Sequence, residues 1–399
     1  MYRRLLNFFD YPVFKSWTAI AVLYALLVII SSLQQIFGTH NYYDIFRYSF
    51  IHLRSGTTLY GFHPGEYIDL YLYGPLFALL FAPFAAVPFW MGWTAWIGFN
   101  AGILYYSIRK LPLTGHQQIT ILFLIAHELL TTIQRGTVNP FITACIILPF
   151  VFTARKKEGA ATFFIALGLL IKIYPVVALA CFPFSRQKIK FLLFFAGWMI
   201  VLGLLPLLFT TLPFLIQTYR QWFEQLLAKN ELNVNPDSLE DISVFGLLRR
   251  SAGWVTLPTL PVLAAGSFAM TWIYLRFKAW RLPAFQGMVL AAVLIFTTIF
   301  STGAESSTYI IAMTGVAIWY ILQPRPVSPW HLFLIIFAFL LISLSPSDLV
   351  PSVARKFIVR HSLKALPAAV IWICLLSQLY RGKLVSETVS ASNELISST

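Results

Sequence analysis

Apolar stretches long enough to cross a lipid bilayer follow one another along most of this chain. A hydrocarbon core of about 30 Å needs a helix of about 17 to 25 apolar residues, and we count about twelve such stretches. Of the 399 residues, 58% are hydrophobic and 11% are charged, with 36 Phe and 12 Trp. A soluble globule could not bury this much apolar surface. The sequence therefore predicts an all-α, polytopic transmembrane helical bundle.

The spans are expected at residues 17–37, 71–88, 89–108, 117–133, 139–154, 160–184, 189–212, 256–275, 284–300, 307–322, 329–345 and 364–380. The N-terminal basic residues mimic a signal peptide, but no small-residue cleavage site follows, so we expect the first span to be retained. An even number of spans puts both termini on one face. Four basic clusters then share that face, which the positive-inside rule assigns to the cytoplasm: Arg3-Arg4, 186–190, 276–281 and 381–383.

Two further basic clusters, at 109–110 and 155–157, conflict with this trace. A re-entrant hairpin at 71–88 or at 160–184 would resolve the conflict. With either choice, the polar loops 38–70 and 213–255 share the outer face.

The prediction is a single integral membrane domain over 1–399 in the cytoplasmic (inner) membrane. Its parts are a catalytic module at 1–212 that includes the outer loop 38–70, a large outer loop at 213–255, C-terminal helices at 256–383 and a disordered tail at 384–399. The formal charge of +14 suits anionic membrane lipids rather than nucleic acid. The three cysteines lie in apolar segments without paired spacing, so we expect no disulfide framework.

Apolar and aromatic residues recur at helical spacing in the first outer loop. This pattern predicts an amphipathic surface helix over about 42–53, with Asp44 in its first turn. The carboxylate has two interpretations that the residues alone leave open. In one, it only complements the helix dipole, which is worth under about 1 kcal/mol; in the other, it is a general base that takes a proton from a sugar hydroxyl.

Polar residues also interrupt two of the apolar segments. Gln134, Arg135 and Asn139 gather in a turn whose Gly and Pro are ordinary punctuation. Lys172 lies inside a predicted span, where an unpaired Lys costs at least about 2.5 kcal/mol. We expect Lys172 to bind a lipid phosphate, and the alternative is a lysine that snorkels from a kinked helix end.

Two later loops hold further candidates. In 213–255, Asp241 and Ser243 suit a carbohydrate, whereas Arg249 and Arg250 suit a phosphate; a solvated loop capped by Asp241 explains part of this equally well. In 301–309, Glu305 would orient a substrate hydroxyl or act as an acid in the first turn of the next helix.

We expect no metal site and no cofactor. His40, His52 and His63 share a loop but fall on no common helical face, and Asp44, Glu66 and Asp69 would bind a divalent ion only if folding gathered them. The chain also lacks a glycine-rich phosphate loop after a strand, which argues against a nucleotide site.

Taken in order, several motifs resemble one family. The retained first span is followed by the loop acid, by Arg54-Ser55-Gly56 to Leu59-Tyr60, by Tyr73-Gly74-Pro75, by 134–140 and by 172–175. This order over about residues 30 to 310 is similar to that of the bacterial GT-C glycosyltransferases of family 87, the polyprenol-phosphate-mannose-dependent mannosyltransferases.

The resemblance implies a multispan helical fold of the GT-C type and inverting transfer from a polyprenyl monophosphate sugar to a hydroxyl on the outer face, without a required metal. Asp44 matches the family's general base. Gln134 and Asn139 match its polar turn, and Lys172 with Tyr174 matches its basic motif in a broken span. Asp241, Ser243, Gly246 and Arg249 match a further pattern. Many members carry a His in the late loop, where this chain has Glu305, Ser306 and Ser307.

The two lines of reasoning combine into one site hypothesis. Asp44 is the catalytic base, and the donor phosphate is bound by Arg135, Lys172, Arg249 and Arg250, which stabilise the charge that grows on the leaving group. Sugar and acceptor, a lipid or glycan hydroxyl, would contact Tyr42, Tyr43, Tyr60, Gln134, Asn139, Tyr174, Asp241, Ser243 and Glu305. Two alternatives stay open: a flippase or transporter of polyprenyl-linked lipids, and a glycan polymerase or ligase that uses a lipid diphosphate.

Overall fold

The computed structural model describes residues 11–35, 41–235 and 239–382. His40, Arg3-Arg4 and the predicted tail at 384–399 lie outside these ranges. All regular structure in the described part of the chain is helical, without a strand. The all-α prediction is therefore confirmed.

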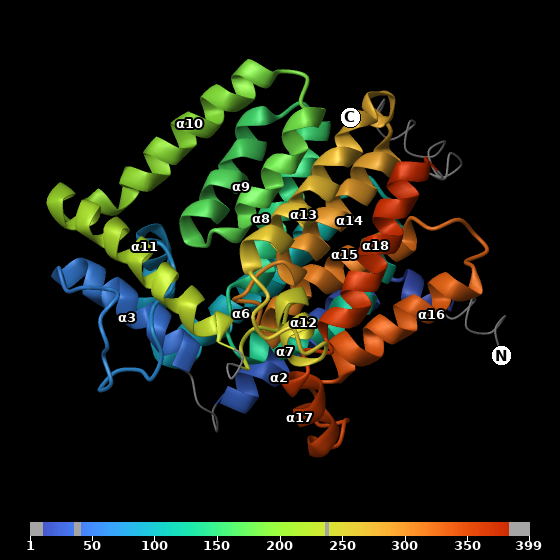
Figure 1. Cartoon of the computed structure of the whole chain (residues 1–399). Helices are drawn as coiled ribbons and strands as arrows, with labels where there is room; N and C mark the ends of the chain where they lie inside the picture. The colour runs from blue at the N-terminus through green and yellow to red at the C-terminus, as the bar shows by residue number, and fades with distance from the viewer. Residues whose placement is uncertain (1–10, 36–40, 236–238, 383–399) are drawn as a thin grey trace. The chain divides into compact units, whose positions relative to one another are not determined.

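Figure 1 shows the helices of the chain, coloured in chain order. By their contacts they divide into two compact units. The first comprises residues 1–24, 105–131 and 233–399, and the second comprises 25–104 and 132–232. Four long helices run from one unit into the other along the chain: α2 (Trp17–Gln35), α6 (Phe89–Arg109), α7 (Gly115–Gln134) and α11 (Leu212–Val234).

The second unit holds the first outer loop and the segments that follow it. Its helices are α3 (Asn41–Ser55), α4 (Pro75–Leu80), α5 (Ala82–Ala85), α8 (Asn139–Ala154), α9 (Glu158–Ile171), η3 (Tyr174–Phe184), α10 (Lys188–Leu204), η4 (Leu205–Leu208) and most of α11 (Leu212–Val234). α9 packs against α8 and α10, and the short helix α4 packs against both α3 and α9.

The first unit holds the C-terminal helices, with α14 packed against α15 and α18. This unit also contains most of α7 and the start of α2. Its other elements are η2 (Pro12–Lys15), α12 (Val244–Arg250), α13 (Thr259–Trp272), η5 (Ile273–Leu275), η6 (Phe277–Ala279), α14 (Pro283–Ile299), η7 (Ser306–Thr308), α15 (Tyr309–Ile321), α16 (Pro329–Ala338), the π-helical turn η8 (Phe339–Leu344), α17 (Ser352–Arg360) and α18 (Ala365–Arg381).

Most predicted spans are helical, but several are broken. The stretch 71–88 contains only the short helices α4 and α5, and the stretch 160–184 divides into α9 and η3. Two helices of the described residues, Trp17–Gln35 and Lys188–Leu208, are long and apolar enough to cross a membrane, and a bent pair, α17 with α18, would make a third. The expected number of about twelve spans is thus not confirmed by helix length.

The predicted amphipathic helix is present as α3. Its Phe46 ring lies 4.8 Å from Phe77 and 5.9 Å from Trp96, measured between ring centroids, so its apolar face is buried against α4 and α6. Asp44 lies in its first turn, as predicted. The segment that follows folds back along α3: the Asn41 side chain accepts a hydrogen bond from Ile68 N and donates one to Asp69.

Candidate functional site

Lys172 lies at the break between α9 and η3, with an extended backbone (φ −149°, ψ 139°). Its ammonium donates a hydrogen bond to Asn139 Oδ1 at 3.3 Å. It also lies 4.7 Å from the ring centroid of Tyr174 and 5.7 Å from that of Tyr73. Aromatic faces attract cations at these distances. The structure thus brings together three of the segments singled out in the sequence, around one half-buried lysine.

The helix break has local causes and a tertiary one. Pro175 has no N–H to donate to the Ile171 carbonyl four residues earlier, and its ring would clash with that carbonyl, so α9 ends at Ile171. The Ile171 carbonyl accepts a hydrogen bond from Gly74 N at 3.0 Å, just before α4. A Cβ on Gly74 would lie 1.9 Å from the Leu170 carbonyl oxygen, so only glycine allows this approach.

The polar turn between α7 and α8 is held by aromatic side chains. Gly136 has φ +68°, and a Cβ there would lie 2.7 Å from the Trp93 ring. Trp96 Nε1 donates to the Gly136 carbonyl at 2.7 Å. Gln134 donates from its side chain to Gln34 Oε1 at 2.6 Å, while Arg135 is exposed. The turn therefore presents Arg135 outward and holds Asn139 buried at the start of α8.

Of the four tyrosines predicted to contact a sugar or the acceptor, two are buried and two are half-buried. Tyr43 is fully buried, and its hydroxyl donates to the Phe84 carbonyl at 2.8 Å. Burial raises the pKa of Tyr43 to about 12, which keeps this donor protonated. Tyr60 is also buried, and its hydroxyl donates to the Tyr73 carbonyl at 2.8 Å. Both tyrosines thus support the fold around the site, whereas Tyr42 and Tyr174 are only half-buried.

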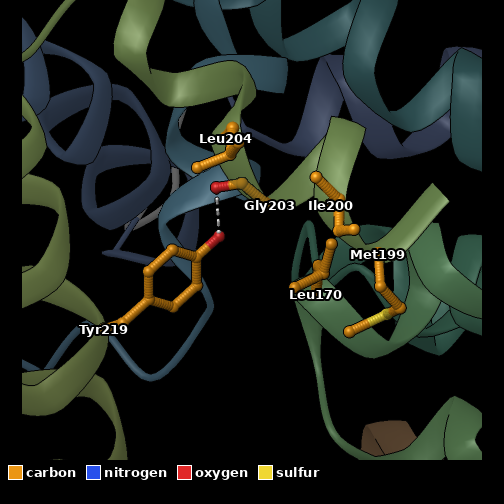
Figure 2. A pocket seen from close by; sticks show the side chains of 6 residues that line it. All are labelled: Leu170, Met199, Ile200, Gly203, Leu204 and Tyr219. Carbon is orange, nitrogen blue, oxygen red and sulfur yellow. Dashed lines mark hydrogen bonds between the residues drawn. The ribbon is translucent and has the colours of Figure 1, made fainter. Parts of the chain in front are cut away.

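An apolar cavity of about 340 Å³ lies between residues of α9, α10 and α11 (Figure 2). It is lined by Leu170, Met199, Ile200, Gly203, Leu204 and Tyr219. The Tyr219 hydroxyl donates to the Gly203 carbonyl at 2.9 Å, which satisfies the polar group that the cavity wall carries. The cavity is therefore suited to hydrocarbon, and one of its lining residues, Leu170, precedes Lys172 by two positions in the chain.

In the first unit, Asp241, Ser243 and Arg249 are buried and bond to one another. Arg249 Nη1 lies 3.2 Å from Asp241 Oδ2, and the Ser243 hydroxyl donates to Asp241 Oδ1. Ser243 also accepts from the amides of Phe245 and Gly246 at the start of α12. Burial raises the pKa of Asp241, against the opposing effects of Ser243 and Arg249. Ser243 rather than Asp241 is therefore the helix cap.

Arg250 and Glu305 occupy less buried positions in the same unit. The Arg250 guanidinium donates to the Asp241 carbonyl and to the Ser362 hydroxyl. Glu305 precedes η7, and its side chain makes no capping hydrogen bond to that helix.

A buried ion pair lies beside Ser306, in the loop 301–309. Lys364 Nζ is 3.0 Å from Glu128 Oε1, and the two side chains are 4% and 0% exposed. Lys364 also donates to the Ser306 carbonyl and hydroxyl, at 2.9 Å each. An acidic residue in the middle of an apolar stretch indicates such a pair, and Glu128 is an acidic residue of this kind.

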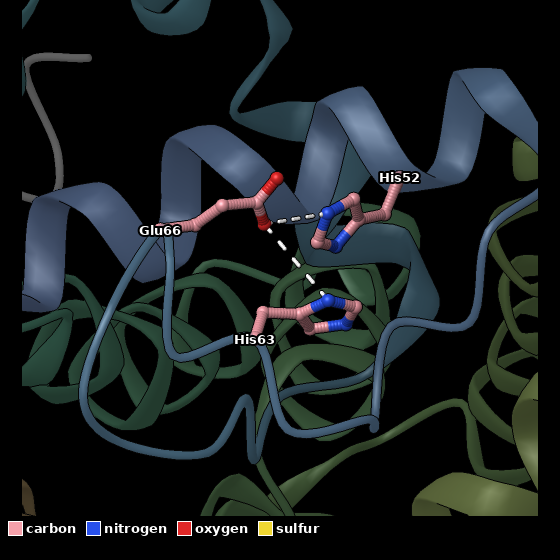
Figure 3. Close-up of side chains that lie close together, drawn as sticks. All are labelled: His52, His63 and Glu66. Carbon is pink, nitrogen blue, oxygen red and sulfur yellow. Dashed lines mark ion pairs between the residues drawn. The ribbon is translucent and has the colours of Figure 1, made fainter.

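The loop histidines His52 and His63 were found to share no helical face, yet the fold of the loop brings them together. His52, His63 and Glu66 converge, with one ligand atom from each within 4.8 Å of the others (Figure 3). They meet because the chain turns back after α3, which helical periodicity does not predict. Among the described residues this group contains Glu66 but neither Asp44 nor Asp69. Burial lowers the pKa of His52, His63 lowers it further, and Glu66 opposes both.

The sequence profile of glycosyltransferase family 87 matches residues 71–302. The chain belongs to glycosyltransferase family 87. It is therefore an enzyme that transfers a sugar, and the flippase alternative falls away. The family 87 match includes Tyr73, Asn139, Lys172 and the cavity residues, whereas Asp44 lies upstream of it. No curated protein matches this family 87 chain.

Proposed function

We propose that this glycosyltransferase transfers a sugar, namely mannose, from a polyprenyl monophosphate to a hydroxyl of a lipid or glycan acceptor. The observation that carries the proposal is the position of Lys172. Its ammonium is bound to Asn139 at a helix break, and Leu170, two residues earlier in the chain, lines an apolar cavity of about 340 Å³. A lipid phosphate needs both features, a cation for its head and apolar surface for its chain.

The cation favours the reaction as well as binding. Negative charge grows on the phosphate oxygen as the bond to the sugar breaks, so a fixed cation stabilises the transition state more than the ground state. Lys172 is oriented by Asn139. Arg135 is exposed on the adjoining turn between α7 and α8, where it is available to a second phosphate oxygen.

Asp44 is assigned the role of base. Its carboxylate accepts the proton of the acceptor hydroxyl, whose oxygen attacks the anomeric carbon, while the bond from that carbon to the phosphate oxygen breaks and polyprenyl phosphate leaves. Attack from the side opposite the leaving group inverts the sugar. α3 supports this role because Phe46 packs 5.0 Å from Tyr73, the same ring that faces Lys172.

The other predicted site residues fall into two groups, according to their burial and their bonding partners. Tyr42, Gln134 and Tyr174 are half-buried and are proposed to contact the sugar or the acceptor. Arg249 and Asp241 bond to each other, as does Arg250 to the Asp241 carbonyl. These contacts weaken the case for a diphosphate donor, which rested on the double arginine, and we therefore prefer the monophosphate.

The topology is part of the same proposal. The enzyme is placed in the cytoplasmic membrane with about twelve passes, several of them broken helices, and with catalysis at the outer face. Contacts within the second unit agree with a shared face for the two polar loops: Thr58 Oγ1 donates to Gln221 Oε1 at 3.1 Å, and Trp222 Nε1 donates to the Leu72 carbonyl at 3.1 Å.

The test is transfer of radiolabelled mannose from synthetic polyprenyl phosphate mannose to a total lipid and glycan extract by purified protein in nanodiscs. Label that moves only when active protein is present supports the donor class. The glucose and arabinose counterparts are assayed in parallel. Absence of transfer from all three monophosphates, with transfer from a diphosphate-linked sugar, would overturn the proposal.

A further inference from the structure

The side chains of His52, His63 and Glu66 form a compact group outside the proposed reaction site (Figure 3). His52 Nε2 lies 2.8 Å from Glu66 Oε2, and His63 Nδ1 lies 3.9 Å from the same oxygen. The two imidazole rings are 4.1 Å apart between centroids, at an interplanar angle of 37°. Two ring nitrogens thus approach one carboxylate oxygen.

The bonding of these atoms is incomplete. Among the residues that the structure describes, neither Glu66 Oε2 nor His52 Nδ1 has a hydrogen-bond partner, although both atoms are buried. The approach of His52 to Glu66 is therefore close without being an aligned hydrogen bond. A buried carboxylate oxygen normally makes a well-aligned hydrogen bond; Glu66 Oε2 has only the ion-pair approach of His52 Nε2 at 2.8 Å, so its lone pairs are available to a bound cation.

The second nitrogen of His63 is already used. His63 Nε2 lies 3.1 Å from the Thr58 carbonyl oxygen, which can only accept a hydrogen bond. This contact puts the proton on Nε2 and leaves the lone pair of Nδ1 facing Glu66. Histidines that bind metals are commonly oriented by such a hydrogen bond from their other nitrogen.

We propose that His52, His63 and Glu66 bind a zinc ion. Two imidazole nitrogens and a carboxylate oxygen are a zinc ligand set, with a fourth position left to water. Tetrahedral bonds of the usual length place neighbouring ligand atoms about 3.3 Å apart. The observed 2.8 Å and 3.9 Å bracket that value, so rotations of the side chains suffice.

The ion would stabilise the outer loop rather than take part in transfer. His52 and Asp44 lie on the same helix, and a rise of 1.5 Å per residue separates them by about 12 Å along its axis. The site joins the C-terminal part of α3 to the segment that leads into Tyr67 and then towards Gly74. Tyr67 packs beside both imidazoles, with ring centroids 6.4 Å from His52 and 5.6 Å from His63.

The experiment uses the full chain, purified in nanodiscs with an affinity tag free of histidine, stripped with a chelator and titrated with zinc alone. Bound zinc is measured by elemental mass spectrometry, and cobalt substitution is followed by visible absorption. We expect one zinc per chain, with affinity lowered at least tenfold in Glu66→Gln and in His63→Asn. His361→Asn, which changes a histidine outside the group, should bind like the wild type.

Thermal unfolding with and without zinc gives a second readout, because a ligand stabilises the folded state that binds it. Zinc should raise the melting temperature of the wild type and of His361→Asn, but not that of Glu66→Gln. Equal zinc binding by the wild type and Glu66→Gln would overturn the proposal, as would a wild type that binds none. Neither readout depends on sugar transfer, so failure here is separate from failure of the proposed function.

Discussion

The ammonium of Lys172 and the side-chain oxygen of Asn139 lie 3.3 Å apart, with Asn139 at the start of α8 and Lys172 just after the end of α9. This hydrogen bond links the start of α8 to the end of α9. It leaves a cation oriented at a helix break, next to two aromatic rings. A lysine that merely snorkelled to the membrane surface would not need a buried amide as partner.

Lys172→Ala is expected to weaken donor binding by about ten- to a hundredfold, because a hydrogen bond to a charged group is worth about 1.5–3 kcal/mol. Transfer should slow as well. The measurement is binding and turnover of polyprenyl phosphate mannose in nanodiscs. Lys190→Ala, which removes an exposed lysine of the same unit, is the control. Unchanged affinity and rate in Lys172→Ala would return this residue to a snorkelling role.

Asp44→Asn is expected to lower the transfer rate by about 10²–10⁴, as is typical for loss of a general base. Expression and donor binding should be retained. The matched control is Asp69→Asn, which changes another carboxylate of the same loop, one that accepts a hydrogen bond from Asn41. Asp44 is not the base if its variant keeps more than about a tenth of the wild-type rate.

Met199→Trp fills part of the apolar cavity beside Leu170. The affinity for a long-chain donor should fall at least about tenfold, since each buried CH₂ contributes about 0.8 kcal/mol. A donor with a very short prenyl chain should bind as before. Leu193→Trp changes a residue that is 68% exposed on the same helix and controls for a bulky side chain on α10. Equal effects on long-chain and short-chain donors would mean that the prenyl chain of the donor binds outside this cavity.

Gly74→Ala is expected to destabilise the protein by about 1–3 kcal/mol, the usual cost of overpacking. The new Cβ would meet the Leu170 carbonyl oxygen at 1.9 Å. Thermal unfolding measures the effect. Gly197→Ala in α10 is the control, because nothing lies within 4 Å of its Cβ position; there alanine should be neutral or stabilising. A wild-type melting temperature for Gly74→Ala would contradict the described approach of α4 and α9.

Arg249→Ala is expected to cost about 3–5 kcal/mol of stability, because it leaves the buried Asp241 without its charged partner. The double variant Asp241→Leu with Arg249→Met should recover much of the loss. Stability and donor affinity are measured together. If Arg249→Ala weakens donor binding at unchanged stability, Arg249 belongs to the donor site.

Local patterns in the sequence sufficed for some of this structure. The spacing of aromatic residues predicted α3, and Lys172 before Pro175 indicated the broken segment. Contacts between residues far apart in the chain could not be predicted from these local patterns. The pairing of Lys364 with Glu128 joins residues far apart in the chain. His52 and His63 meet only because the loop turns back.

The aromatic residues show a further limit of sequence reasoning. Tyr43 and Tyr60 were expected to contact a sugar, yet both donate their hydroxyl to a backbone carbonyl in a buried position. A tyrosine suits either role, since it combines apolar area with one polar atom. Only the packing partners decide between the two.

The hydrogen bond from Gly74 N to the Ile171 carbonyl also determines how this part of the protein opens. Separating the two segments would leave a peptide donor and a peptide acceptor unpaired in apolar surroundings, at a cost of about 1–3 kcal/mol for each group. The end of α9 and the start of α4 should therefore exchange their amide hydrogens as one cooperative unit, however far apart they lie along the chain.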